Sequence, residues 1–236
     1  MKEYLSVRGI VYQSVNVLED KEGLAAMRAM GARSVPVVAR AGKFVYAQVI
    51  KDVVEFLGLN ELTGPELAPA ALAERADVVL TTAARLVRQM PQTALVNQLP
   101  HRPRSWRVLM HHIFQIPVAF LEMEERGTRL EYEVMVAEPP ATMLSSSEIA
   151  EFGEAVQQRF DAWWARAGNE SFTGTVPTYF GETTRHEMLE RTVWHSAQHV
   201  RQLAALLEQV GVRPDRPLGA AEIAGLPLTD KIWDEA

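Results

Sequence analysis

The stretch of sequence that decides the fold is ERTVWHSAQHVRQL, residues 190–203. It contains two histidines four residues apart, His195 and His199. On an α-helix this separation places both side chains on one face, about 6 Å apart along the axis, where two imidazoles can bind one metal ion. The stretch therefore predicts a helix that carries part of a metal site.

The helix around the two histidines has clear ends in the sequence. Thr184 followed three residues later by Glu187 is typical of a capping box, and Gly211 is a C-terminal stop after Gln209 and Val210. A mostly apolar stripe runs through both histidines, so we expect them to face other helices. The stripe consists of Met188, Thr192, His195, His199, Leu203 and Leu206.

A third ligand has to come from the other four histidines, because the chain has no cysteine. His101 lies in a proline-bounded loop and His186 in the first turn of the predicted helix, so we expect both in solvent. The adjacent pair, His111 and His112, lies in a second predicted helix that begins after Ser105 as its cap.

Helical phase separates the members of this adjacent pair. His111 shares its stripe with Arg104 and Arg107, whereas the stripe of His112 is apolar. The phase therefore predicts that His112 is buried and that His111 is its neighbour on the surface. The apolar residues in the stripe of His112 are Val108, Leu109, Ile116 and Ala119.

A tryptophan shortly before a His-His-aliphatic run, followed much later by Val-Trp-His-x-x-x-His, resembles the DinB-like (YfiT-like) metal-binding four-helix bundles. The resemblance covers residues 67–207, most of the chain. In that family the ligands are the second histidine of the double and both histidines of the later motif. The resemblance therefore implies His112, His195 and His199 as ligands of a divalent metal, zinc or nickel.

Three neutral imidazoles with an open fourth position are typical of a catalytic metal, because structural zinc sites are closed by four protein ligands. A bound water or thiol then becomes a nucleophile near neutral pH. The resemblance implies a metal-dependent enzyme acting on a small molecule, either a low-molecular-weight thiol S-transferase or a hydrolase. Candidate general bases are Glu122, Tyr179 and Glu190, although the sequence does not place them beside the metal.

A different class of function is also open, namely a noncatalytic two-domain protein that binds metal or docks a partner. An enzyme needs an open metal position in an accessible pocket, whereas a fourth side chain would cap a structural site. A metalloprotease is excluded, because HEMLE at 186–190 has Glu190 where a zincin requires its second histidine. Glu187 is better explained as the capping-box acid.

The four predicted helices of residues 67–236 follow from apolar periodicity and cap signals. The third helix opens at Ser145 with Glu148 and ends at Gly168, and Pro117 inside the second helix is expected to kink it. We expect the aromatic residues Phe160, Trp163, Trp164 and Trp194 in the core or in pocket walls. The first helix is marked by Leu72, Val79, Leu80, Ala83, Leu86 and Met90.

The first 59 residues predict a small α/β module, joined by a linker at 60–66. Its first helix is capped by Asp20 and stopped by Gly31, and its second helix, at 49–57, closes the module. The three expected strands are the apolar runs 10–17, 35–39 and 44–46.

This module resembles a glutaredoxin that lacks its front, through KEYL at 2–5, RGI at 8–10, VNV at 15–17 and GARSVPVV at 31–38. The resemblance implies a cis-proline at Pro36. It also implies a redox-inert domain, because thiol-disulfide exchange needs a thiolate and the chain has no cysteine.

The expected fold class is therefore two-domain α+β, a truncated thioredoxin-like module followed by an antiparallel four-helix bundle of DinB type. The first strand of a glutaredoxin is missing from this module. We expect either that the start of the reading frame was placed after the codons for this strand or that the protein has lost the strand. A three-stranded remnant would then pair 10–17 directly with 35–39, or have its edge covered by the helical domain or a second chain.

Composition bounds the partners and the compartment. The 236 residues are 47% hydrophobic with a formal net charge of −6 and no Lys/Arg-rich stripe, which argues against a nucleic-acid surface. No apolar run is long enough to cross a bilayer and no signal core follows Met1, so we expect a cytoplasmic protein. Exposed apolar stripes on such bundles are compatible with a homodimer.

Overall fold

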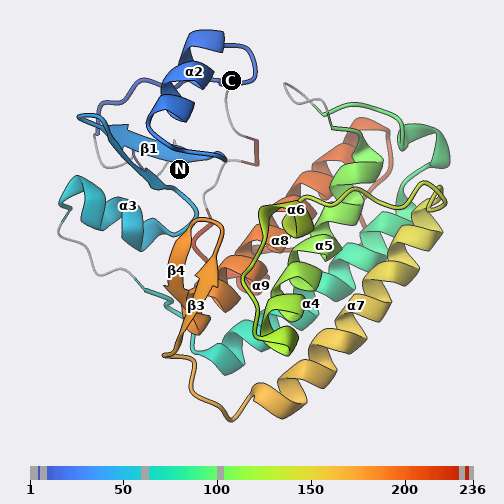
Figure 1. Ribbon diagram of the computed structural model, residues 1–236. Helices are drawn as coiled ribbons and strands as arrows, with labels where there is room; N and C mark the ends of the chain where they lie inside the picture. The colour runs from blue at the N-terminus through green and yellow to red at the C-terminus, as the bar shows by residue number, and fades with distance from the viewer. Residues whose placement is uncertain (1–4, 6–9, 60–63, 100–103, 229–231, 234–236) are drawn as a thin grey trace. The chain divides into compact units, whose positions relative to one another are not determined.

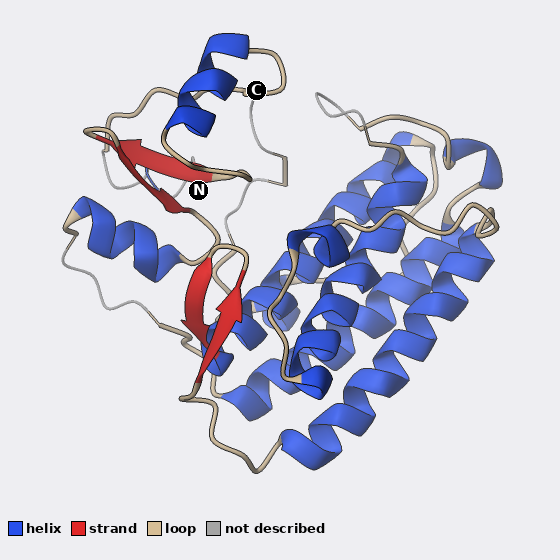
Figure 2. Ribbon diagram, in the orientation of Figure 1, coloured by secondary structure: helices blue, strands red, loops and turns tan. Residues whose placement is uncertain are grey.

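The computed structural model describes residues 5, 10–59, 64–99, 104–228 and 232–233. The chain divides into two compact units, Met1–Gly64 with Thr229–Ala236, and Pro65–Leu228. Within the described residues, the strands form two antiparallel hairpins, one in each unit, and helices make up most of the rest (Figure 2). The protein is thus mostly helical α+β, as the sequence predicts.

The smaller unit contains α2 (Lys21–Ala29), β1 (Val37–Arg40), β2 (Lys43–Tyr46) and α3 (Ile50–Leu57). Helix α2 begins after the predicted cap Asp20, and helix α3 ends at the predicted residue, Leu57. The Asp20 side chain accepts a hydrogen bond from the Gly23 N–H at 2.8 Å, which caps α2. Gly58 adopts the left-handed conformation, with φ 71°, that closes α3.

Strands β1 and β2 pair antiparallel, with Val37 opposite Tyr46 and Arg40 opposite Lys43. The Val35–Pro36 peptide bond before β1 is cis, as the resemblance implies. The core of the unit is a small cluster in which partly buried side chains surround three buried ones. The buried residues are Leu5, Ala47 and Val53, and around them pack Ile10, Val38, Val45 and Leu57.

The prediction of a strand at 10–17 is wrong, and the sheet has two strands among the described residues. The Asn16 side-chain oxygen accepts a hydrogen bond from the Leu18 N–H at 3.2 Å, and the Asn16 backbone carbonyl accepts one from the Asp20 N–H at 2.8 Å. This local turn competes with sheet pairing, and Val11 remains 98% exposed. Residues 1–4, 6–9 and 60–63, which carry other parts of the predicted module and linker, lie outside the described residues.

The larger unit is a bundle of four long helices, α4 (Pro69–Gln89), α5 (Trp106–Arg126), α7 (Ser146–Ala167) and α8 (Arg185–Gln209). Helices α4 and α5 each pack against both α7 and α8 (Figure 1). No helix in the described part of the chain combines the length and apolar character needed to cross a membrane. The short elements are η1 (Gln92–Ala94), α6 (Tyr132–Met135), β3 (Thr175–Thr178), β4 (Gly181–Thr184) and α9 (Ala220–Ile223).

The predicted capping residues begin three of these helices. Ser105 accepts from the Val108 N–H at the start of α5, and Ser145 with Glu148 forms a complete capping box on α7. Thr184 forms the second box with Glu187 on α8. Because β4 ends at the capping residue itself, the hairpin leads directly into the helix that carries two of the histidines.

The core of the bundle lies where α5 and α7 approach closely. A side chain at Gly153 of α7 would collide with the ring of Phe114, because an added Cβ would stand 2.3 Å from the Phe114 Cζ. Phe120 meets Trp163 edge to face at 4.9 Å between ring centroids, and Phe160 lies beside both rings. Phe160 and Trp163 are buried, as predicted, whereas Trp164 and Trp194 are half-buried. The buried rings hold α5 against α7.

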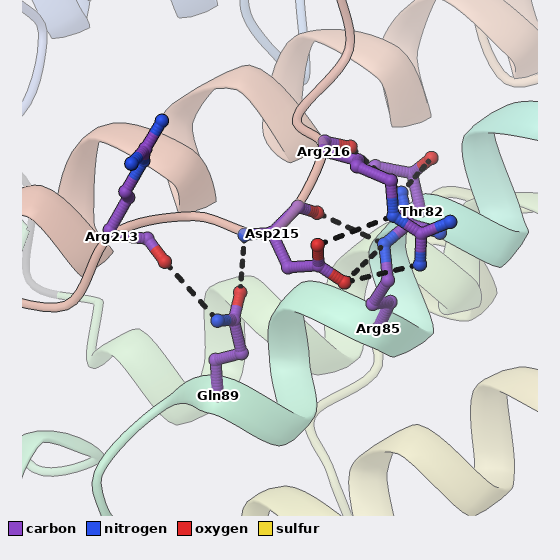
Figure 3. Close-up of polar contacts among 6 residues, drawn as sticks. All are labelled: Thr82, Arg85, Gln89, Arg213, Asp215 and Arg216. Carbon is purple, nitrogen blue, oxygen red and sulfur yellow. Dashed lines mark hydrogen bonds and ion pairs between the residues drawn. The ribbon is translucent and has the colours of Figure 1, made fainter.

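Two side chains of α4 form hydrogen bonds with residues 213–216, which follow α8 (Figure 3). Arg85 donates from Nε to the Asp215 carbonyl at 3.0 Å and from Nη2 to the Arg216 carbonyl at 2.8 Å. Gln89 donates to the Arg213 carbonyl at 3.2 Å and accepts from the Asp215 N–H at 2.8 Å. This clasp, Arg85 and Gln89 on residues 213–216, satisfies backbone groups of a segment without regular structure.

Candidate metal centre

The structure brings His112 of α5 together with His195 and His199 of α8. One ring nitrogen from each can be chosen so that all three lie within 4.8 Å of one another. Among the described residues this is the one such group of three or more histidine or carboxylate side chains, and no carboxylate joins it. The two helices thus place three imidazoles around a common centre.

The three rings form a nearly equilateral triangle. Centroids are 5.4 Å apart for His112 and His195, 5.1 Å for His112 and His199, and 4.9 Å for His195 and His199. The ring planes meet at 79°, 61° and 43°, so the rings do not stack face to face. Ligand nitrogens of a tetrahedral zinc lie about 3.4 Å apart, so the group is close to the spacing that one ion requires.

Two of the three rings, those of His112 and His195, are held in the neutral state that metal ligation needs. His112 and His199 are buried, and His195 is half-buried. Burial is the largest cause that lowers the pKa values of His112 and His195, and the positive charges of Arg191 and Arg104 lower them further. A neutral imidazole keeps the lone pair that binds a metal.

Hydrogen bonding selects which nitrogen of His199 faces the centre. The Nδ1 of His199 lies 2.7 Å from the Gln202 Oε1, an acceptor, so Nδ1–H donates and Nε2 keeps its lone pair. The buried Nδ1 of His195 makes no hydrogen bond within the described residues. A buried ring nitrogen without such a bond is unfavourable unless it binds something, so these residues fit a divalent metal that prefers nitrogen ligands.

The prediction that His111 lies on the surface is wrong. It is only 3% exposed and stacks on Phe152 of α7, with ring centroids 4.9 Å apart and planes at 12°. Burial, followed by the charge of Arg107, lowers its pKa to about 4. Helical phase distinguishes the two histidines only if α5 has one buried face, but α5 is covered by α7 as well as by α8. His111 nevertheless does not join the three-histidine group.

Arg191 is a neighbour of the centre that the sequence analysis missed. It lies one helical turn before His195 on α8 and is only 2% exposed. Its Nη2 donates to the Tyr179 hydroxyl at 3.1 Å, and its guanidinium stands 5.1 Å from the centroid of Phe180. The four-residue spacing to His195 was the available signal, but an arginine in such a sequence usually faces solvent.

The candidate bases lie in different surroundings. Tyr179 connects with the centre through its bond to Arg191. Glu122 pairs with Arg126 at 3.6 Å and is ten residues beyond His112 on α5, about 15 Å along the helix. Burial raises the pKa of Glu190 to about 7, and its charged neighbours are Glu66 and Glu187 rather than the histidines.

The remaining histidines stay apart from this group. His186, expected in solvent, is half-buried, and its Nε2 lies 2.8 Å from the Leu67 carbonyl. His101 lies outside the described residues. Glu187 accepts from the Thr183 and Thr184 hydroxyls and from the Thr184 N–H, which confirms its role as the capping acid.

No model of a known protein family matches the chain, and no curated protein is significantly similar to it. The DinB-like and glutaredoxin-like resemblances therefore rest on sequence patterns. What the structure provides is a helical bundle with a buried group of three histidines that could hold a metal ion.

Proposed function

We propose that His112, His195 and His199 bind a divalent metal ion, zinc or nickel, and that the protein is a metal-dependent enzyme of the DinB-like class. The observation that carries this proposal is the meeting of three imidazoles from two helices with no carboxylate among the described residues joining them. Such a ligand set leaves a coordination position for a substrate or a water molecule.

The proposed reaction is transfer of a low-molecular-weight thiol to a small-molecule substrate, or hydrolysis. A divalent ion bound by these histidines would supply Lewis acidity and favour the deprotonated form of a thiol or water. Gln202 orients the His199 ring. The positive charge of Arg191 beside the rings favours negative charge on a bound group.

The domain assignment belongs to the same proposal. Residues 1–59 would form a truncated, redox-inert glutaredoxin-like module, followed by a linker at 60–66 and a DinB-like bundle at 67–236. The bundle with its histidines supports the last assignment. A net charge of −6 disfavours nucleic acid as a partner. A homodimer in the cytoplasm would be compatible with this assignment.

One observation favours the alternative, a noncatalytic metal-binding or docking protein. Two hollows in the described part of the bundle are lined by residues other than the three histidines. One, of about 340 Å³, is lined by Arg85, Arg88, Glu154 and neighbouring residues, and the other, of about 10 Å³, lies beside Pro117. A catalytic metal normally lies in a pocket that admits the substrate.

A test of both functions starts from the metal content of the purified full-length protein. The protein is then assayed for thiol-dependent consumption of small electrophiles and for hydrolysis, before and after chelation. The enzyme proposal expects turnover that chelation abolishes and added zinc or nickel restores. Stoichiometric metal without turnover would support the noncatalytic class, and no affinity for any divalent metal would contradict both.

A further inference from the structure

Helix α5 lacks one backbone donor in its middle. Pro117 lies inside the helix and has no N–H. In an α-helix that N–H would donate to the carbonyl four residues earlier, so the Ile113 carbonyl loses its helical partner. Because Ile113 is completely buried, water does not readily replace that partner.

Ser196 of α8 supplies the missing donor. Its Oγ donates to the Ile113 carbonyl at 2.9 Å, and the serine is only 2% exposed. Thr192, one turn earlier on α8, instead bonds the Met188 carbonyl of its own helix at 2.9 Å, the usual arrangement for a hydroxyl residue in a helix. The Ser196 hydroxyl therefore bridges two helices where its neighbour serves only one.

The surroundings of this bridge favour a protein donor over solvent. A cavity of about 10 Å³ lies beside Pro117 and Ser196, at the lower limit for one water molecule. Its walls are mostly apolar, and they include Ala76, Val79, Leu80, Phe160 and Val193.

The bridge joins α5 and α8 next to the candidate ligands. Its acceptor, Ile113, directly follows His112, and its donor, Ser196, directly follows His195. A hydrogen bond there limits both sliding and rotation of one helix against the other. We propose that Ser196 is a positioning residue of the metal centre, acting through a carbonyl that Pro117 leaves open. The proposal rests on the function proposed above.

The test measures Co²⁺ binding to the full-length protein with Ser196→Ala, Pro117→Ala and the double variant. Removing the hydroxyl alone should weaken Co²⁺ binding about 3- to 10-fold, as loss of one buried hydrogen bond does, and should change the visible spectrum of the bound ion. In the double variant, the Pro117→Ala substitution restores the helical N–H to the Ile113 carbonyl. The Co²⁺ affinity of the double variant should therefore return to within about 2-fold of that of Pro117→Ala.

Thr192→Val is the matched control, because it also removes a buried hydroxyl bond from α8 but leaves the bridge intact. It should lower Tm without changing Co²⁺ affinity or spectrum. The proposal is overturned if Ser196→Ala, like this control, leaves Co²⁺ affinity and spectrum unchanged. It is also overturned if Ser196→Ala lowers Co²⁺ affinity by the same factor in the unaltered protein and in the Pro117→Ala variant. If the unaltered protein binds no Co²⁺ or other divalent metal, the proposed function itself fails, which is a different result.

Discussion

The two units differ in how completely they bury their side chains. In the bundle, whole stripes of α4, α5 and α8 are buried, and of the three histidines His112 and His199 are buried and His195 is half-buried. In the described part of the smaller unit, the core cluster contains three buried residues, and Val11 and Leu18 are exposed. Burial keeps imidazoles neutral and fixed in place, so the bundle can present a preformed ligand group. The described part of the smaller unit contains no such group.

The largest expected effect breaks the centre itself. His199→Ala should weaken zinc binding by more than about 100-fold, beyond the loss typical when only a hydrogen-bond partner of a ligand is removed. The bundle should stay folded, because the rest of its apolar stripe remains. Zinc affinity by competition and far-UV circular dichroism measure the two effects.

His111→Ala is the matched control, since it removes an adjacent, equally buried imidazole that stands outside the group. It should keep zinc affinity within a few-fold of the unaltered protein. If His199→Ala retains full zinc content, or His111→Ala loses as much, the ligand assignment is wrong.

The next prediction compares the two cores. Phe114→Ala in the bundle should cost about 3–5 kcal/mol of stability, and Val53→Ala in the smaller unit about 1–3 kcal/mol. Only the first should alter metal binding, because Phe114 lies on the helix that carries His112. Chemical denaturation and Co²⁺ titration report the two properties. A loss of metal affinity in Val53→Ala would show that the two units are coupled.

A third prediction uses a half-buried acid of the bundle, Glu190. Burial raises the folded-state pKa of Glu190 to about 7, above its unfolded value, so stability should fall as pH rises from about 5 to 8. Glu190→Gln should remove this dependence and add about 1–3 kcal/mol at pH 8, with little difference below pH 4.5. Urea denaturation across this pH range measures it.

Glu148→Gln provides the opposite sign as a control. The hydrogen bonds that Glu148 accepts from Ser145 lower the pKa of its carboxyl group. The charged form therefore stabilises the fold at pH values above the usual glutamate pKa. The substitution should therefore destabilise at pH 8. Equal pH profiles for the two variants would contradict the raised pKa of Glu190.

The smallest effect is expected at the clasp on residues 213–216. Arg85→Ala removes two bonds from a half-buried side chain to backbone carbonyls, and with them a bond to the Thr82 hydroxyl and an ion pair with the exposed Asp215. The cost should be about 1 kcal/mol. Hydrogen exchange should quicken in the clasped segment while Co²⁺ affinity stays unchanged. A fall in Co²⁺ affinity would mean that this segment also supports the centre.

Features set by local contacts were predictable from the sequence. The caps at Asp20, Ser145 and Thr184 depend on bonds that span three residues, so short patterns identify them. His195 and His199 follow in the same way from helical spacing. The three-histidine group needed one additional step, the phase of His112 on another helix.

Features set by distant contacts were not predictable in this way. The run 10–17 is apolar enough for a strand, but a strand forms only with a partner, and a turn at Asn16 takes its place. His111 is buried because a second helix covers it. The role of Ser196 depends on Pro117 of another helix, a relation that neither residue reveals alone.

The most direct test of the central claim is the X-ray absorption spectrum of the zinc-loaded, full-length protein at the zinc edge. The account predicts about three imidazole ligands with nitrogens about 2.0–2.1 Å from the ion, and at least one further light atom. His112→Ala should lose imidazole scattering, whereas His111→Ala should reproduce the spectrum of the unaltered protein. Coordination by carboxylate oxygens with no imidazole contribution would contradict the account.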